Sequence, residues 1–303
     1  RLFCFPHAGS GAVQFRFWAQ ALAPAIDIVA VQPPGREARA HEAPLTSLDA
    51  MLAELTPRIA ESIHGPYALF GHSMGARLAY EVARELVGGG HGAPKKLLVS
   101  GHGTPGSAPR IKLSTMTEQQ LYDHLRKSGE TPQALLDEPD FMARILPVLK
   151  ADAGVTEGVP AREGSQLGCP IRAYVGESDP MWKLEDLQGW AKLTRGDFKA
   201  QALPGAHLYL VANAQQRMAL INELLDLARI EAGITEFKRE TIDMRELFQS
   251  LHALHQPVAE KRQIALKWDI SDYLADLVGD ARLLRQALVN VVGNGLKYTK
   301  AGG

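Results

Sequence analysis

The sequence predicts an α/β fold with a mainly parallel sheet and a helical lid, followed by an incomplete, helix-rich α+β segment. Up to about residue 210, short apolar runs alternate with segments whose apolar residues recur at helical spacing, and such alternation builds a parallel sheet. Residues 111–160 interrupt this alternation with helical patterns alone. Of the 18 prolines, 17 precede residue 213 and only Pro257 follows it. We therefore expect two differently built domains, 1–212 and 213–303.

The predicted strands of the first domain are short apolar runs bounded by turn-forming residues. They cover Leu2–Phe5, Ile26–Val31, Tyr67–Phe70, Leu97–Ser100, Ile171–Val175 and Phe198–Leu203. The predicted helices cover Val13–Leu22, Leu48–Ile63, Ala76–Leu86, Leu184–Leu193 and, within 111–160, Thr117–Lys127 and Phe141–Lys150. Because ligands bind at the carboxyl ends of parallel strands, we interpret residues 111–160 as a lid over that edge.

The second domain has a different pattern. Its predicted elements are the amphipathic helices Met218–Ala232, Thr241–Lys261 and Asp280–Leu296 and the strand Ile264–Ile270. The segment Ala214–Ala232 is amphipathic enough to bury one face against a sheet. We expect it to pack on the sheet of the first domain.

The composition excludes several classes of protein. Lys and Arg number 33 against 34 Asp and Glu, so neither a nucleic acid nor a membrane surface is an expected partner. No run of 18 apolar residues could span a bilayer. Cys4 and Cys169 are too few for a disulfide framework, which favours buried thiols and a reducing cytoplasm. The chain opens directly on a strand, without Met or a signal peptide, so we expect a few residues to precede Arg1 naturally.

The strongest chemical motif is Gly71-His72-Ser73-Met74-Gly75, which lies between a predicted strand and a predicted helix. A G-x-S-x-G pattern in this context is typical of a nucleophile elbow, a sharp turn that exposes a serine hydroxyl at the edge of the sheet. The glycines are needed because side chains there would collide with the neighbouring backbone. Ser73 is therefore the candidate nucleophile.

A serine nucleophile needs a base and a carboxylate that orients the base. In sheet hydrolases they follow the serine in the order carboxylate, then histidine. Asp179 follows the strand that ends near Gly176, and His207 follows the strand that ends at Leu203. Glu177 is the alternative orienting carboxylate. We expect no metal and no cofactor in this chemistry.

The oxyanion hole is expected from backbone N–H groups. One belongs to the residue after the nucleophile, Met74, and the other to the loop after the first strand, Phe5-Pro6-His7-Ala8-Gly9. A second glycine pattern, Gly101–Gly106, matches G-x-G-x-x-G, but Pro105 and Pro109 argue against the helix that a dinucleotide site requires.

Several separated blocks give residues 1 to about 212 a resemblance to the type II thioesterases of polyketide and non-ribosomal peptide biosynthesis. The matching blocks are residues 5–9, 32–37, 69–76, 80–84 and 205–210. The resemblance implies an α/β-hydrolase that releases acyl groups from the phosphopantetheine thiol of an acyl or peptidyl carrier protein. It also implies the triad Ser73, Asp179 and His207, with the N–H groups of Ala8 and Met74 as the oxyanion hole. A general carboxylesterase or lipase of the same fold is the alternative.

The second domain resembles part of a sensor histidine kinase. Residues 221–233 resemble its second dimerisation helix, and residues 284–299 resemble its N box. That resemblance implies Asn290 and Asn294 near Mg²⁺ and phosphates, and Lys297 and Tyr298 near the nucleotide. However, no phosphoacceptor histidine with the following acidic residue and Thr-Pro is present, and no D-x-G-x-G box follows. We therefore expect neither kinase activity nor ATP binding, and consider a non-catalytic signalling fragment as the remaining alternative.

Overall fold

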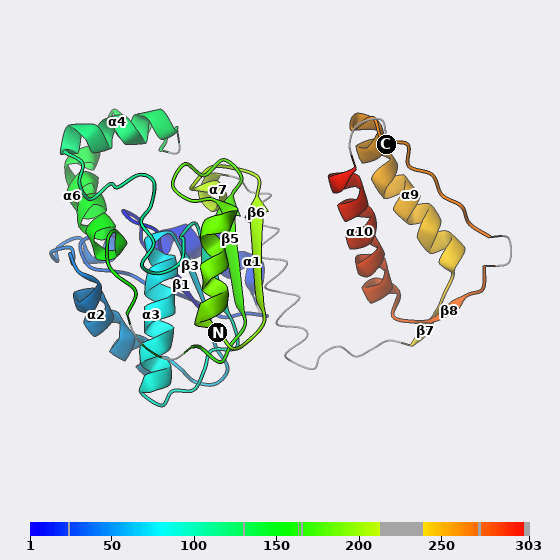
Figure 1. Ribbon diagram of the computed structural model, residues 1–303, viewed down its shortest axis with the longest axis horizontal. Helices are drawn as coiled ribbons and strands as arrows, with labels where there is room; N and C mark the ends of the chain where they lie inside the picture. Colours follow the sequence, from blue (N-terminus) through cyan, green and yellow to red (C-terminus); the bar gives the residue numbers. More distant parts are fainter. Residues whose placement is uncertain are drawn as a thin grey trace. The chain divides into compact units, whose positions relative to one another are not determined.

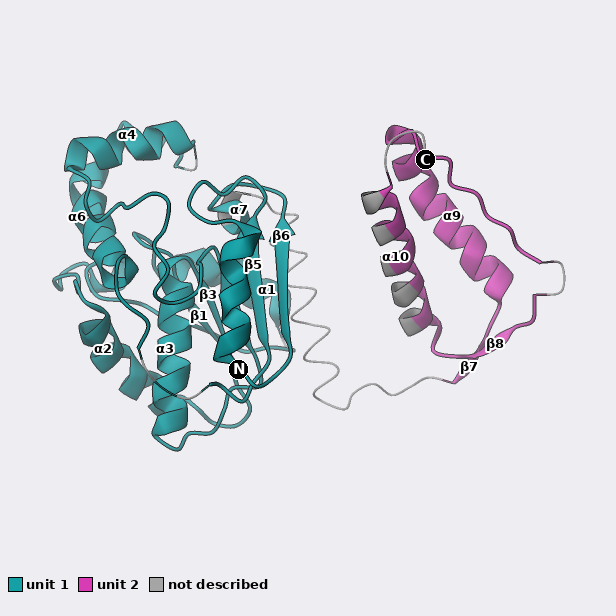
Figure 2. Ribbon diagram, in the orientation of Figure 1, with its two compact units in different colours: residues 1–228 teal, residues 229–303 magenta. Residues whose placement is uncertain are grey.

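The computed structural model describes residues 1–23, 25–129, 131–162, 164, 166–212, 239–271 and 274–299. The chain forms two compact units, Arg1–Ala228 and Arg229–Gly303 (Figure 2). The predicted domain boundary at 212/213 lies at the beginning of residues 213–238, which are outside the described part. The predicted helix Met218–Ala232 and the proposed packing of Ala214–Ala232 on the sheet also lie outside it.

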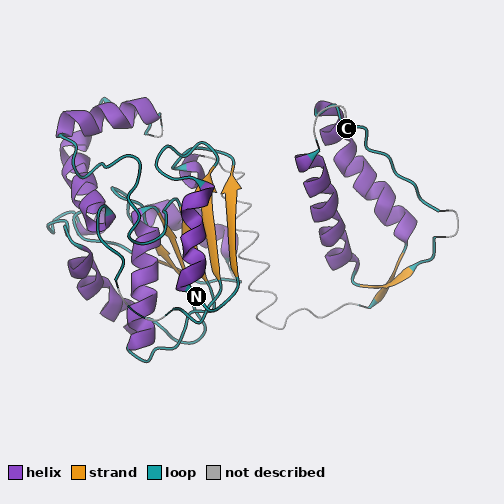
Figure 3. Cartoon of the chain, in the orientation of Figure 1, coloured by secondary structure: helices purple, strands orange, loops and turns teal. Residues whose placement is uncertain are grey.

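A six-stranded parallel sheet forms the centre of the first unit, with the strand order β2-β1-β3-β4-β5-β6 (Figure 3). The strands are β1 (Leu2–Phe5), β2 (Ile28–Ala30), β3 (Ala68–His72), β4 (Leu97–Ser100), β5 (Ile171–Gly176) and β6 (Phe198–Leu203). The predicted strands are thus confirmed. Since all strands run in the same direction, the loops that follow them meet at one edge.

Helices cover both faces of this sheet. They are η1 (Ala12–Phe15), α1 (Arg16–Leu22), η2 (Glu37–Arg39), α2 (Leu48–Glu61), α3 (Met74–Gly88), η3 (Leu184–Leu193) and α7 (Tyr209–Ala212), where η marks a 3₁₀-helix. Figure 1 shows α3 lying along the strands. The helices predicted between the strands are confirmed, and Leu184–Leu193 takes the tighter 3₁₀ form.

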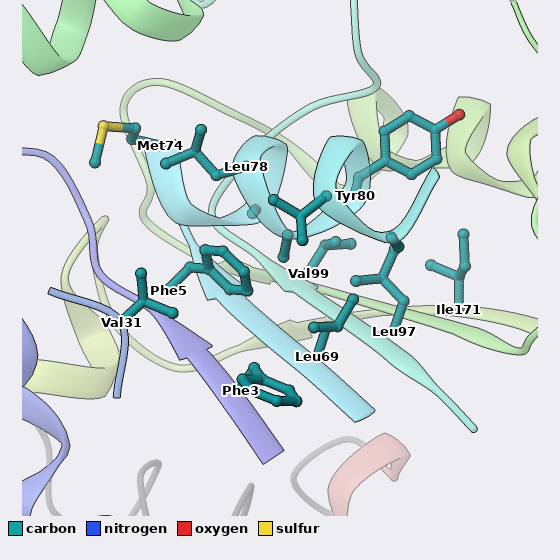
Figure 4. Packing of buried hydrophobic residues seen from close by; sticks show 14 of the residues in the cluster. Phe3, Phe5, Val31, Leu69, Met74, Leu78, Tyr80, Leu97, Val99 and Ile171 are labelled. Carbon is teal, nitrogen blue, oxygen red and sulfur yellow. The ribbon is translucent and has the colours of Figure 1, made fainter. Parts of the chain in front are cut away.

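Successive side chains of each strand point to opposite faces of the sheet and pack into two separate cores. Phe3, Phe5 and Leu69 belong to the core under α2 and α3, whereas Leu2, Cys4 and Phe70 belong to the core on the α1 side. Figure 4 shows Phe5, Leu69 and Val99 below Leu78 of α3. Burial of both faces explains why the inner strands β1 and β4 are continuous apolar runs, whereas the edge strand β6 alternates between exposed and less exposed residues. Cys4 and Cys169 are free and buried, as expected for small apolar residues.

The predicted lid is a layer of three helices, α4 (Glu118–Ser128), α5 (Gln133–Leu136) and α6 (Pro139–Thr156) (Figure 1). Thr117 begins α4 with a capping box that includes Gln120, and Pro139 occupies the first turn of α6, where its missing N–H costs nothing. The helices share a core of Leu121, Leu136 and Met142, with neighbouring residues. Within the lid, the short helix α5 is the element that the spacing pattern does not predict.

The second unit contains a small antiparallel ladder and two helices. Its elements are β7 (Glu240–Ile242), α9 (Met244–Lys261), β8 (Leu277–Gly279) and α10 (Ala281–Tyr298). Asp243 caps α9 through the N–H groups of Arg245 and Glu246, so the predicted helix starts at Met244 and not at Thr241. Within the described ranges of both units, no helix combines the length and apolar character needed to cross a membrane.

The predicted strand Ile264–Ile270 is wrong. This segment is extended, and its residues alternate between half-buried and exposed, but it pairs with no strand of the described chain. The alternation instead turns side chains such as Trp268 toward the core of the second unit, where Trp268 lies 5.9 Å from the ring of Phe248. Alternation thus reports burial on one side of an extended chain, whether or not a ladder is present.

Candidate active site

Ser73 sits on the sharp turn between β3 and α3. Its φ of 55° and ψ of −120° fall outside the regions that ordinary residues favour. The Ser73 N–H donates to Ser100 O at 2.7 Å, and Ser73 O accepts from the N–H of Ala76 at 2.9 Å. The surrounding hydrogen bonds therefore hold the strained turn that presents the hydroxyl.

Two glycines make this turn possible. A Cβ on Gly71 would lie 2.0 Å from Gly75 O, and a Cβ on Gly75 would lie 2.2 Å from Phe5 O. In both cases the obstacle is backbone, which cannot rotate away as a side chain does. The glycines of the predicted elbow are thus required by close packing of β1, β3 and α3.

Gly71→Ala should destabilise the first unit strongly. We expect the free energy of unfolding in urea to fall by about 3 kcal/mol or more, because the inserted methyl forces the backbone of the elbow apart. Gly88→Ala is the matched control: Gly88 is the last residue of α3, is exposed, and has no atom within 4 Å of the position that a Cβ would take. Alanine there should change stability by no more than about 1 kcal/mol. Equal losses for the two variants would contradict this account.

The three predicted side chains of the triad meet at the carboxyl edge of the sheet. His207 Nε2 lies 2.9 Å from Ser73 Oγ, and His207 Nδ1 lies 2.8 Å from Asp179 Oδ2. Asp179 is fully buried, and its Oδ1 accepts the N–H groups of Met181 at 2.7 Å and Trp182 at 3.2 Å. These bonds fix the carboxylate, and the carboxylate in turn orients the imidazole.

Geometry separates Asp179 from the alternative, Glu177. The side chain of Glu177 is exposed, and the hydrogen bond from the His207 ring goes to Asp179. Gly176 allows the two loops to touch, since a Cβ there would lie 2.2 Å from Ala206 O. Of the two carboxylates, Asp179 is therefore the one that contacts the imidazole of His207.

The predicted oxyanion donors, Ala8 and Met74, line the same cavity as Ser73 and His207. Met74 is the first residue of α3, so its N–H lacks a partner four residues earlier in the helix. Among the described residues, no acceptor meets the N–H of Ala8. Both donors are thus available to an oxygen of a ligand.

A buried polar chain supports the elbow from behind. His72 Nδ1 lies 2.9 Å from Ser100 Oγ, which lies 2.5 Å from the hydroxyl of Tyr209. Burial, followed by the nearby His207, lowers the pKa of His72 well below its ordinary value. His72 is therefore a neutral packing residue at neutral pH.

Two more neutral histidines flank the site. Burial lowers the pKa of His7 and of His102 to about 4. His102 Nδ1 lies 2.7 Å from Gly103 O, and its ring lies 5.2 Å from that of Trp182. A Cβ on Gly103 would lie 2.2 Å from the same indole. The second glycine pattern is thus a packing feature, and turns follow it where a dinucleotide site needs a helix.

A cavity of about 340 Å³ lies between the catalytic edge and the lid. Ser73, His207 and the loop of Ala8 form one end of it. Its remaining lining includes mainly apolar lid residues, namely Leu113, Leu125, Leu135, Phe141, Ile145 and Leu149. An apolar chain attached to a carbonyl fits such a cavity, with the carbonyl at the polar end.

The sequence pattern did not single out Asp152, which lies on α6 and pairs with Arg36. Arg36 is part of one of the blocks that carry the thioesterase resemblance. One feature of the sequence could have pointed to Asp152: this acidic residue lies among the apolar positions of a lid helix, where Val148, Leu149 and Val155 are also buried. A buried carboxylate needs a partner, and here the partner is 116 residues away.

The predicted N box lies in the second unit. Asn290, Asn294, Lys297 and Tyr298 belong to α10 of the second unit, and their side chains lie outside the described part. In the part of the chain that the structure describes, no three His, Cys, Asp or Glu side chains are grouped so that they could hold a metal ion.

The parallel sheet, the elbow and the hydrogen-bonded Ser, His and Asp define a serine hydrolase of the α/β-hydrolase class. The thioesterase domain family matches residues 1–226, and the chain belongs to this family. It is therefore a serine hydrolase that acts on thioesters, and the resemblance to type II thioesterases is confirmed for this part of the chain.

Three similar proteins illustrate the relationship. The gramicidin S biosynthesis protein GrsT of Aneurinibacillus migulanus is 32% identical, with 75% of this chain and 89% of the relative covered. The medium-chain S-acyl fatty acid synthase thioesterase of Rattus norvegicus is 34% identical, with 70% of this chain and 81% of the relative covered. The solved structure of the type II thioesterase BorB from the borrelidin biosynthetic cluster is 34% identical, with 75% and 92% covered and a TM-score of 0.69.

Proposed function

We propose that Ser73, His207 and Asp179 are the catalytic triad of this thioesterase. His207 Nε2 takes the proton of Ser73 Oγ as the oxygen attacks the thioester carbonyl. The negative charge that develops on the carbonyl oxygen is received by the N–H groups of Ala8 and Met74. The observation that carries this proposal is the unbroken hydrogen-bonded series from Asp179 through His207 to Ser73.

The tetrahedral intermediate then expels the thiol. His207 returns its proton to the departing sulfur, which leaves readily because a thiol has a pKa of roughly 8.5, far below that of an alcohol. A water molecule next enters, His207 takes its proton, and the resulting attack on the acyl-serine releases a carboxylic acid and restores Ser73. The buried carboxylate of Asp179 stabilises the imidazolium at both stages.

We propose further that the natural substrates are acyl groups on the phosphopantetheine thiol of an acyl or peptidyl carrier protein, and that the enzyme edits polyketide or non-ribosomal peptide synthases. Support comes from the relatives, because GrsT is named for gramicidin S biosynthesis and BorB for the borrelidin cluster. The apolar lining of the cavity fits the acyl part. The free, buried thiols of Cys4 and Cys169 are consistent with a cytoplasmic location.

Release of acids from a panel of acylated carrier proteins, followed by mass spectrometry, tests this proposal. We expect a higher kcat/KM for a carrier-bound thioester than for the oxygen ester of the same acyl group, because part of the binding energy comes from the carrier. A general carboxylesterase or lipase, the alternative of the same fold, would hydrolyse the simple ester at least as well. That result would overturn the assignment to carrier proteins.

We propose that the first domain covers residues 1–212, with residues 111–160 as its lid. For the remainder of the chain, residues 213–303, we propose a domain that resembles part of a sensor histidine kinase and catalyses no reaction of its own. The helix α10 contains most of the residues that resemble the N box. A titration with Mg²⁺ and ATP tests it, and we expect no saturable binding. Saturable binding that is lost in Asn294→Ala would instead favour a nucleotide-binding signalling module.

A further inference from the structure

A buried ion pair joins the lid to the loops around the catalytic serine. The side chains of Arg36 and Asp152 are 4% and 0% exposed. The guanidinium bonds both carboxylate oxygens, with Nη2 at 2.8 Å from Oδ1 and Nη1 on Oδ2. Asp152 belongs to the lid helix α6, whereas Arg36 follows the loop after β2, so the pair connects elements far apart in the sequence.

The same carboxylate holds the loop that contains Ala8. The N–H of Gly9 donates to Asp152 Oδ2 at 2.8 Å. On the other side, Arg36 Nη1 donates to Ser10 O at 3.4 Å. The loop is also closed on itself, because the N–H of Ser10 donates to His7 O at 3.1 Å. Every direct link from the pair to this loop thus lies within two residues of Ala8.

The backbone conformation of Gly9 makes its hydrogen bond to Asp152 important for the loop that contains Ala8. Gly9 has a φ of +77°, and a Cβ there would lie 3.5 Å from Leu149 and 3.7 Å from Ile145, both on α6. Glycine rotates more freely than other residues, so the hydrogen bond from its N–H restrains the Ala8–Gly9 peptide. Through Ala8 Cα this peptide is joined to the His7–Ala8 peptide, which carries the N–H of Ala8 and whose carbonyl accepts the N–H of Ser10. A donor in an oxyanion hole acts only if it lies about 2.7 to 3.1 Å from the developing oxyanion.

We propose that Asp152 is a positioning residue for the oxyanion hole: held by Arg36, its carboxylate fixes the Gly9 N–H against α6, so that the N–H of Ala8 is aligned only while the lid helix is seated. Asp152 itself acts through Gly9 and not on the substrate. The proposal rests on the proposed role of Ala8, and it makes the lid part of the catalytic apparatus as well as the wall of the cavity.

A second buried pair in the same unit provides the matched control. Arg77 and Glu81 of α3 are 0% and 1% exposed and lie 2.8 Å apart. Arg77 donates to Val159 O and Pro160 O, just beyond the end of α6. This pair therefore resembles the first in burial and in its link to the lid, but among the contacts of the described residues none joins it to the loop of Ala8.

The test separates positioning from stability through the double variant Arg36→Met with Asp152→Leu. Replacing a buried ion pair by apolar residues is often neutral for stability, yet Gly9 still loses its acceptor. With an acyl-N-acetylcysteamine thioester, we expect kcat to fall about 10- to 100-fold with KM nearly unchanged. A trifluoromethyl ketone, whose adduct with Ser73 places an oxyanion in the hole, should lose affinity by a similar factor.

Asp152→Ala and Glu81→Ala provide the comparison should the double variant not fold, because alanine removes the acceptor of the Gly9 N–H, whereas the amide oxygen of an asparagine could keep it. Both lower the melting temperature, and we expect only Asp152→Ala to lower kcat and ketone affinity together. A kcat equal to that of the unmodified enzyme in a stable double variant would overturn the proposal. Equal kcat values for the two single variants would also overturn it. Ser73→Ala tells failure of the positioning role apart from failure of the proposed function. Turnover that survives in Ser73→Ala would refute the proposed triad, whatever the variants of Asp152 show.

Discussion

Ser73→Ala should reduce thioester hydrolysis by about 10⁴-fold or more, because it removes the hydroxyl that contacts the proposed base and forms the acyl-enzyme. The hydroxyl lies 2.9 Å from the base, and the strained turn that presents it is independent of the side-chain oxygen. We therefore expect the variant to fold normally. Single-turnover experiments with an acyl thioester, read by mass spectrometry of the intact protein, should show an acyl adduct on the unmodified protein and none on the variant.

Ser178→Ala is the control for this experiment. Ser178 is exposed on the loop after β5, and its link to the site is the backbone bond from its N–H to Gly205 O at 2.9 Å, which alanine retains. Its turnover should stay within about twofold of the unmodified protein. An acyl adduct or sustained turnover in Ser73→Ala would contradict the proposed nucleophile.

Asp179→Asn should lower kcat by about 10³- to 10⁴-fold while leaving the fold intact. The amide can still accept the N–H groups of Met181 and Trp182 through one oxygen. Its NH₂ group would then face His207 Nδ1, which favours the tautomer with the proton on Nε2, and that tautomer cannot accept the proton of Ser73. The imidazolium also loses its neighbouring negative charge, so both steps slow down.

Glu177→Gln is the matched control, because it makes the same chemical change two residues away on an exposed side chain. We expect kcat within about twofold of the unmodified enzyme. The measurement is the steady-state rate with an acyl-N-acetylcysteamine thioester for both variants. A large loss in Glu177→Gln together with a small loss in Asp179→Asn would reverse the assignment of the orienting carboxylate.

Much of the first unit is readable from the sequence because its signals are local. A parallel strand buried on both faces is a continuous apolar run, and β1 and β4 end where their sequences predict. The elbow is likewise local, since a serine between two glycines at the junction of strand and helix has few other uses. The failed strand Ile264–Ile270 shows the limit of this reasoning, because alternation reveals a buried side but not a neighbouring strand.

The sequence by itself determined the order of the strands along the chain, the elbow and the candidate residues Ser73, Asp179 and His207, since each of these follows from neighbouring residues. Only the tertiary structure decided which carboxylate faces His207, because Glu177 and Asp179 follow the same strand and differ only in the direction of their side chains. Only the tertiary structure also shows that Asp152 contacts Arg36 and Gly9. Contacts across more than 100 residues depend on how helices pack over a sheet, and no local pattern of residues specifies that packing.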